Sequence, residues 1–145
     1  MAADSNISED GTRPESATSY HARLRNGGSI SRTFDTTARR NIQLKYFWQG
    51  DADVDEGTDV LSVYWKKTTD PDFILLTTQT LEATTWSESV FNLPSEADDT
   101  SIDIQFVGST NRSEEEARID DVSLEGEIID RDAPILAETT PVATP

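Results

Sequence analysis

The chain has 145 residues, which suits one domain with terminal segments, and its 28 Asp and Glu against 12 Lys and Arg give a net charge of -16. Such a charge repels phosphate backbones and anionic lipids, and no apolar run approaches the roughly 18 residues of a membrane helix. Nucleic acid partners and membrane insertion are therefore not expected. The absence of cysteine excludes disulfides, thiolate metal sites and a cysteine nucleophile.

The first 18 residues are polar and show no periodicity, so we expect residues 1–18 to be mostly flexible, with room for one edge strand. The opening, MAADSNISEDG, has neither a basic end nor an apolar core, and no signal peptide is expected there. If the native protein is secreted, the chain is then a segment of a larger protein.

Short apolar runs separated by turn signals fill residues 19–127. Residues 42–48 and 61–65, for example, alternate apolar and polar side chains, which is typical of strands with one buried face. The runs are SYHARLR, SISRTFD, NIQLKYFWQ, DVLSVYWKK, FILLTTQ, WSESVFNL, SIDIQFVG and EARIDDVSLE. They predict an all-β fold, an antiparallel β-sandwich of the jelly-roll type. Residues 128–145 have the composition of a linker or tail.

The last run breaks the alternation. Ile119 and Val122 are three positions apart, whereas Val122 and Leu124 are two apart, so regular alternation cannot bury all three side chains. A β-bulge at Asp120 and Asp121 would restore the phase, and it would also re-aim a carboxylate. We therefore predict a bulge at this position.

A family resemblance runs from about Ser19 to Gly126. Its stretches are SYHARLRNGGSISRTFDTT, NIQLKYFWQGDADVDEGTDVLSVYW, WSESVFNLP, IDIQFVGS and EEARIDDVSLEG. They resemble the cysteine-free jelly-roll modules, similar to carbohydrate-binding modules and MAM-type domains, of secreted bacterial and archaeal proteins. The resemblance implies an extracellular or cell-surface module beside neighbouring domains of a larger surface protein. It also implies a structural calcium with Asp121 or Asp120 among its ligands, although the N-terminal segment departs from the family's first strand.

Catalysis is not expected. His21 is the only histidine, and a Ser–His–Asp triad would have to use it, although it lies on a polar strand face beside Arg23 and Arg25. Carboxylates are so abundant that no pair stands out as an acid and a base. We interpret the chain as a non-catalytic binding module, carbohydrate-binding in particular. The alternative is a structural or adhesive spacer without a small ligand, and a small hydrolase is a third, weaker interpretation.

Aromatic side chains interleaved with long polar ones are suited to a glycan, because sugar rings stack on aromatic faces. Tyr64 lies opposite the apolar face of its strand, beside Lys66, and Phe47 lies likewise between Lys45 and Gln49. We predict that these five residues bind a polysaccharide or another glycan. A binding module should expose two or more aromatic side chains together, whereas a spacer should bury nearly all of them.

The stretch GDADVDEGTD, residues 50–59, begins like a calcium loop, with aspartates at alternate positions. It then departs from the helix–loop–helix pattern, because Glu56 stands where the sharp turn needs glycine and Ser62 stands where a bidentate glutamate is needed. Two interpretations remain for the chain's acidic loops. One is a solvated turn between two strands, and the other is a calcium site elsewhere, centred on Asp121 with ligands from a neighbouring segment.

Overall fold

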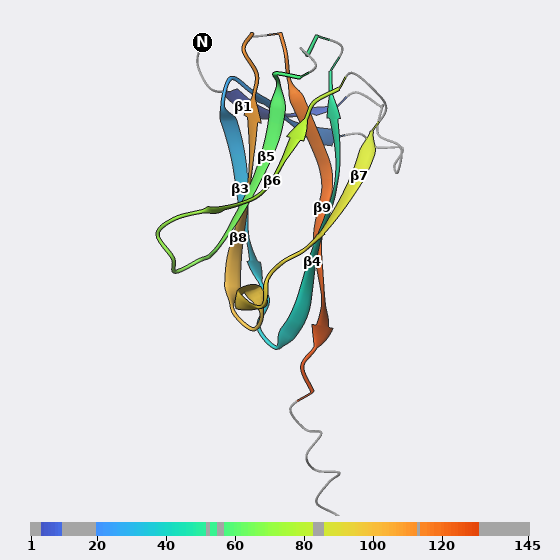
Figure 1. Cartoon of the computed structure of the whole chain (residues 1–145). Helices are drawn as coiled ribbons and strands as arrows, with labels where there is room; N and C mark the ends of the chain where they lie inside the picture. The colour runs from blue at the N-terminus through green and yellow to red at the C-terminus, as the bar shows by residue number, and fades with distance from the viewer. Residues whose placement is uncertain are drawn as a thin grey trace, which may run out of the picture.

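The structure, a computed structural model, describes residues 4–9, 20–51, 53–54, 57–82, 86–112 and 114–130, with the side chains of residues 4–9, 20 and 21 excepted. These ranges hold nine strands and one short 3-10 helix (Figure 1). The elements are β1 (Asp4–Glu9), β2 (Tyr20–Arg25), β3 (Gly28–Asp35), β4 (Arg39–Gly50), β5 (Val60–Lys67), β6 (Ile74–Thr80), β7 (Ser87–Asn92), the helix (Ser95–Ala97), β8 (Ser101–Ser109) and β9 (Ala117–Ile128).

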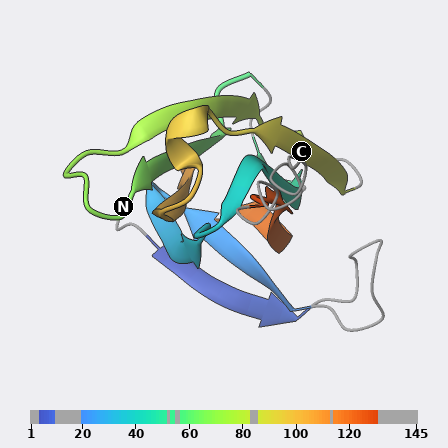
Figure 2. The same ribbon diagram turned by 90° about the horizontal axis from the view of Figure 1, so that it is seen from below.

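The strands form two antiparallel sheets. A five-stranded sheet has the order β1-β2-β9-β4-β7, and a four-stranded sheet has the order β3-β8-β5-β6. Figure 2 shows the two layers from below, with β5 and β6 on one side of the core and β1 and β2 on the other. From β2 to β9 this is the strand order of a jelly roll, so the predicted all-β sandwich is confirmed.

β1 adds a further strand at the edge of the five-stranded sheet. It pairs with β2 from Asp4 opposite Arg25 to Glu9 opposite Tyr20. Its sequence, DSNISE, has a single large apolar residue, so its place depends on backbone pairing rather than on an apolar face. The expectations for residues 10–19 and 131–145 lie outside the described residues.

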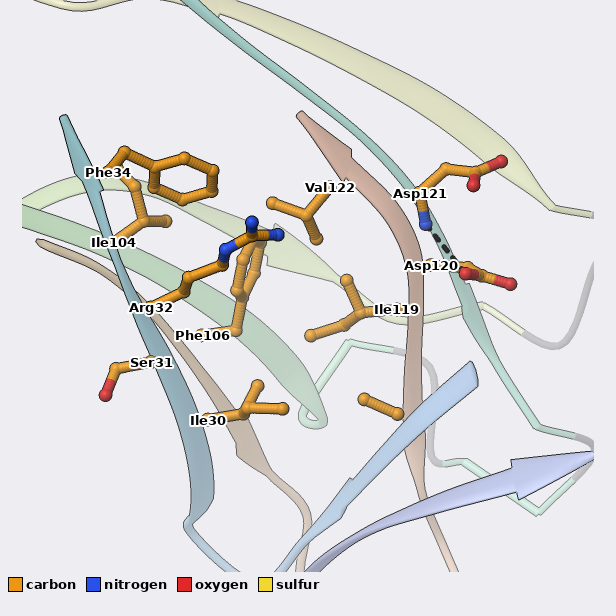
Figure 3. A pocket seen from close by; sticks show the side chains of 11 residues that line it. Ile30, Ser31, Arg32, Phe34, Ile104, Phe106, Ile119, Asp120, Asp121 and Val122 are labelled. Atoms are coloured by element: carbon orange, nitrogen blue, oxygen red, sulfur yellow. Dashed lines mark hydrogen bonds between the residues drawn. The ribbon is translucent and has the colours of Figure 1, made fainter. Parts of the chain in front are cut away.

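The predicted bulge in β9 is confirmed. Asp121 and Val122 together lie opposite one residue of β4, Tyr46, and Asp121 has a φ of 50°. As a result Ile119 and Leu124 both pack toward the core, as Val122 does. Figure 3 shows the carboxylate of Asp121 on the opposite side of β9 from Val122. The bulge therefore keeps three apolar side chains inside while it turns an acidic one out.

A polar network closes the side of the sandwich at β6 and β7. The hydroxyl of Tyr46 donates to the side-chain oxygen of Gln79 at 2.6 Å, and the Gln79 amide donates to Ser89 Oγ at 2.7 Å. Trp48 Nε1 donates to the same Ser89 oxygen at 2.8 Å. Since Gln79 belongs to the four-stranded sheet and the others to the five-stranded sheet, the network fixes the two sheets to each other.

Candidate functional site

The five predicted ligand-binding residues lie on two opposite surfaces. On β4, Leu44 and Tyr46 are fully buried, so Lys45, Phe47 and Gln49 point outward from the five-stranded sheet. On β5 the same alternation points residues 64 and 66 outward from the four-stranded sheet. The core separates the two groups, and a single binding face made of all five residues does not form. Alternation within a strand shows which residues share a face, but not which sheet the strand joins.

Phe47 lies on the outer face of the five-stranded sheet, between its central strand β9 and its edge strand β7. β4 is an inner strand, and Phe47 is opposite Asp120 on β9 and opposite Glu88 on β7. The Phe47 ring is half-buried. Its packing against the sheet fixes its orientation, and part of the ring stays accessible to a ligand. An apolar ring flanked by two carboxylates offers a stacking surface next to strong hydrogen-bond acceptors.

A chain of polar contacts orients Gln49 on this face. Arg118 Nη1 donates to Gln49 Oε1 at 3.3 Å, and Arg118 Nε donates to Glu116 Oε1 at 3.0 Å. Arg23 Nη1 lies 3.6 Å from the other Glu116 oxygen. Because the Glu116 side chain is buried and contacts both guanidinium groups, it holds both in place. Sequence reasoning missed Arg118 and Glu116, since only the register of β4, β9 and β2 brings them beside Gln49.

Lys45 places its ammonium at the same face, in an ion pair near the surface. Its Nζ lies 3.5 Å from a carboxylate oxygen of Glu125, and both side chains are substantially exposed. A solvent-exposed pair of this kind contributes about 0–1 kcal/mol, so a ligand can displace it at little cost.

On the opposite sheet, Lys66 is engaged by its own hairpin and by Asp103 of β8. Its ammonium lies 3.3 Å from Asp103 Oδ2 and donates to the carbonyl oxygens of Thr68 at 3.0 Å and Asp70 at 2.9 Å. It also lies 5.4 Å from the ring centroid of Phe73. These contacts use the three donors of an ammonium group. Lys66 therefore stabilises the β5–β6 turn, and no donor remains for a ligand.

Within the described ranges, no aromatic side chain is fully exposed. Phe34, Phe47, Trp48, Tyr64, Phe73 and Phe91 are half-buried, and Tyr46, Trp65, Trp86 and Phe106 are buried. Two aromatic side chains exposed side by side are therefore not found in this part of the chain. The spacer alternative stays open on this criterion.

The calcium expected at Asp121 and Asp120 stays a prediction. Asp120 Oδ1 accepts a hydrogen bond from the Asp121 backbone N–H at 2.7 Å. Two carboxylates supply fewer oxygens than the roughly six to eight that calcium takes. In the part of the chain that the structure describes, no three His, Cys, Asp or Glu side chains are grouped to hold a metal ion. The pair on its own does not fit calcium, and further ligands would have to come from elsewhere.

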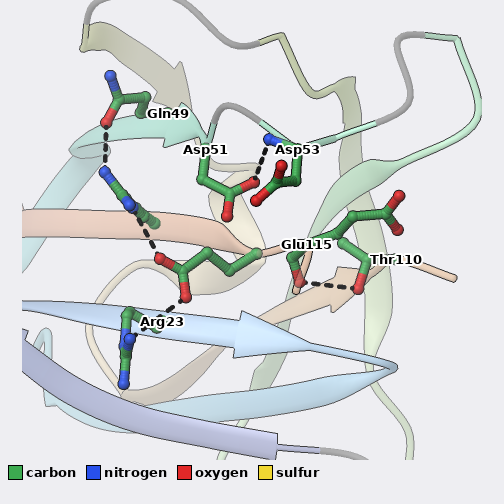
Figure 4. Close-up of polar contacts among 8 residues, drawn as sticks. Arg23, Gln49, Asp51, Asp53, Thr110 and Glu115 are labelled. Atoms are coloured by element: carbon green, nitrogen blue, oxygen red, sulfur yellow. Dashed lines mark hydrogen bonds and ion pairs between the residues drawn. The ribbon is translucent and has the colours of Figure 1, made fainter. Parts of the chain in front are cut away.

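The acidic loop between β4 and β5 is not uniformly solvated. Asp51 and Asp59 are buried, whereas Asp53 is exposed. Asp51 Oδ1 accepts a hydrogen bond from the Asp53 N–H at 3.1 Å (Figure 4). The Asp51 N–H donates to the Glu116 carbonyl at 3.2 Å. The solvated-turn interpretation is therefore wrong for Asp51 and Asp59, which are both buried. The start of β9 covers Asp51. Residues 55 and 56 of this loop lie outside the described residues.

Asp51 makes folding stability depend on pH. Burial raises its pKa above the ordinary 3.8, and the nearby Glu116 charge adds to this effect, against hydrogen bonds that lower it. The folded protein therefore holds this proton more tightly than the unfolded chain, and ionisation of Asp51 lowers stability as the pH rises above 3.8. We expect Asp51→Asn to raise Tm at pH 7 and to have little effect near pH 3.

Thermal melts of both proteins between pH 3 and pH 7 check this prediction. Asparagine removes the charge and keeps one oxygen that can accept the Asp53 N–H. A loss of Tm that grows from pH 3 to pH 7 would contradict the prediction, because the fold would then favour the ionised carboxylate.

The architecture and strand order define a jelly-roll β-sandwich. Neither a family model nor a curated protein matches the chain. Among solved structures, the chain is similar to the CBM22-1 xylan-binding domain from Paenibacillus barcinonensis, with a TM-score of 0.57 and 8% identity over 86% of this chain and 84% of that one. It is also similar to a carbohydrate-binding module of the β-sandwich superfamily, with a TM-score of 0.60 and 10% identity over 85% of this chain and 54% of that one.

A third similar structure is the enzymatically active domain of tailspike protein 4 of bacteriophage CBA120. The TM-score is 0.56 and the identity 12%, over 86% of this chain but only 18% of the tailspike domain. At such identities the likeness is one of fold. The resemblance to carbohydrate-binding jelly-roll modules is confirmed at that level.

Proposed function

We propose that the chain is a non-catalytic carbohydrate-binding module of an extracellular or cell-surface protein. Its glycan site is the outer face of the five-stranded sheet around Phe47. The observation that carries the proposal is the placement of this ring between Glu88 and Asp120, with Lys45 and Gln49 next along the same strand. Similarity of fold to a xylan-binding domain and to a second carbohydrate-binding module supports it.

Each group on this face has a part in binding a sugar chain. The Phe47 ring stacks against the C–H face of one sugar, and the carboxylates beside it accept hydrogen bonds from hydroxyl groups. Gln49, oriented by Arg118, adds an amide that both donates and accepts. A shallow face of this kind binds one chain weakly, and neighbouring domains of a larger surface protein raise the avidity. Calcium at Asp121 and Asp120 would serve structure only.

The extracellular or cell-surface location is part of the same proposal. In the residues that the structure describes, no helix combines the length and the apolar character needed to cross a membrane.

Phe47→Ala is expected to weaken polysaccharide binding about tenfold or more, which corresponds to about 1.4 kcal/mol, while the domain stays folded. Tyr64→Ala is the matched control, because Tyr64 is also half-buried and outward-facing but lies on the other sheet. Affinity gel electrophoresis with soluble xylan, mannan, laminarin and hydroxyethyl cellulose measures both variants. Loss of binding in Tyr64→Ala alone would move the site to the four-stranded sheet.

The spacer function is the second candidate, and it is favoured by the absence of a fully exposed aromatic side chain among the described residues. A spacer would migrate unretarded in every one of these gels while showing a cooperative thermal melt. Retardation by any one polysaccharide that depends on Phe47 excludes the spacer.

A further inference from the structure

The side of the sandwich opposite the Tyr46–Gln79–Ser89 network is not closed. β2 pairs with β9 only from Ala117 to Ile119, and the bulge at Asp121 follows directly. β3 is the edge strand of the facing sheet. Between β3 and the first half of β9, at residues 119–122, lies a pocket of about 360 Å³. This volume accommodates a molecule of one or two rings, at the lower end of the usual range for ligand sites.

The pocket is lined by apolar side chains from both sheets. They are Ile30 and Phe34 of β3, Ile104 and Phe106 of β8, and Ile119 and Val122 of β9 (Figure 3). Ile30 remains 36% exposed although its strand neighbours show that it faces the interior. The apolar surface of this pocket lies inside the sandwich but stays open to water. Covering it with an apolar ligand is therefore favourable.

One cation faces this pocket. Arg32 reaches from β3 across the pocket in the direction of Val122, and its guanidinium carbon lies 4.8 Å from the Phe34 ring centroid. The carboxylates of Asp120 and Asp121 lie on the far side of β9 in Figure 3, and Asp120 is opposite Phe47 on the outer face. Asp120 and Asp121 also belong to the lining, but their carboxylates turn away, so Arg32 is the charged group that faces the apolar side chains of the pocket.

We infer that this pocket binds a small aromatic carboxylate. A flat ring fits between the β3 and β9 side chains and stacks on the Phe34 and Arg32 planes. The carboxylate then pairs with the guanidinium, which presents a planar pair of donors suited to a carboxylate. The net charge of -16 opposes an anion at long range, but salt screens it beyond about 10 Å, whereas Arg32 acts in contact. The site is independent of Phe47.

Indole-3-acetate and its neutral analogue indole-3-ethanol test the inference by NMR titration of the full chain. Indole-3-acetate is expected to bind more tightly, with shifts in the amides of Ile30, Arg32 and Val122. Arg32→Gln is expected to weaken indole-3-acetate about tenfold and indole-3-ethanol by less than about twofold. Ile30→Glu, at a position exposed enough to tolerate the change, is expected to weaken both probes.

Arg40→Gln is the charge control, because Arg40 is exposed and pairs with Glu127 away from the pocket. It should leave the affinity of both probes unchanged. The inference is overturned if neither probe shifts the pocket amides, or if Arg32→Gln weakens both probes equally. An equal loss of indole-3-acetate affinity in Arg32→Gln and Arg40→Gln would also overturn it, since net charge alone would then explain binding.

Discussion

Tyr46→Ala is expected to lower the free energy of unfolding by about 3–5 kcal/mol. The side chain is fully buried, its ring lies edge-on to Phe106 at a centroid distance of 5.0 Å, and it stacks with Phe91 at 6.2 Å. Burial also raises the pKa of Tyr46 far above its usual value, so the hydroxyl stays protonated and donates to Gln79. Alanine would leave a cavity and remove the donor that fixes Gln79 between the sheets.

Phe47→Ala is the matched control for this prediction, because the next residue of β4 points to the outer face. Its expected cost is about 1 kcal/mol, since the ring is half-buried and has no core partners to lose. Tyr46→Phe, which keeps the ring and removes the hydroxyl, should cost about 1–2 kcal/mol. Urea denaturation of the three variants measures these differences. Equal losses for Tyr46→Ala and Phe47→Ala would contradict the assignment of faces on β4.

Gly108→Ala is expected to destabilise the domain by about 3 kcal/mol or more, at the upper end of overpacking effects. A Cβ at this position would lie 2.6 Å from the Leu24 Cβ and 2.8 Å from the Leu24 carbonyl oxygen. Gly108 cannot retreat, because β8 is hydrogen-bonded on both sides, to Gly28 of β3 and to Leu61 of β5. The added methyl group would have to force β2 away from β8.

Ser109→Ala separates this close approach from a general effect of substitution in β8. Ser109 is the next residue and is exposed, so its replacement should change the free energy of unfolding by less than about 0.5 kcal/mol. Urea denaturation of both variants provides the comparison. Wild-type stability in Gly108→Ala would mean that the two sheets are farther apart at Leu24 than the structure has them.

The fold could be predicted from the sequence because its strands carry the information locally. Alternation in β4 and β5 marks their buried faces, and the irregular spacing of Ile119, Val122 and Leu124 locates the bulge. β1 is different. Its residues are almost all polar, so only the edge of β2 that it completes explains why it is a strand.

The candidate site was only half predictable, because it depends on which strands become neighbours. Phe47 and Tyr64 have the same local pattern, yet β4 and β5 join opposite sheets. The support of Gln49 by Arg118 arises from residues 69 positions apart. Asp51 reads as part of a solvated loop, and it is buried because the start of β9 covers it.

The glycan site around Phe47 is tested by an NMR titration of the isotopically labelled chain. The ligands are oligosaccharides of whichever soluble polysaccharide retards the chain in gels. We expect the largest amide shifts to fall on Lys45, Phe47 and Gln49 and on the adjoining positions of β7 and β9. Shifts centred on Tyr64 and the four-stranded sheet, or no shift with any of the polysaccharides tested, would contradict it.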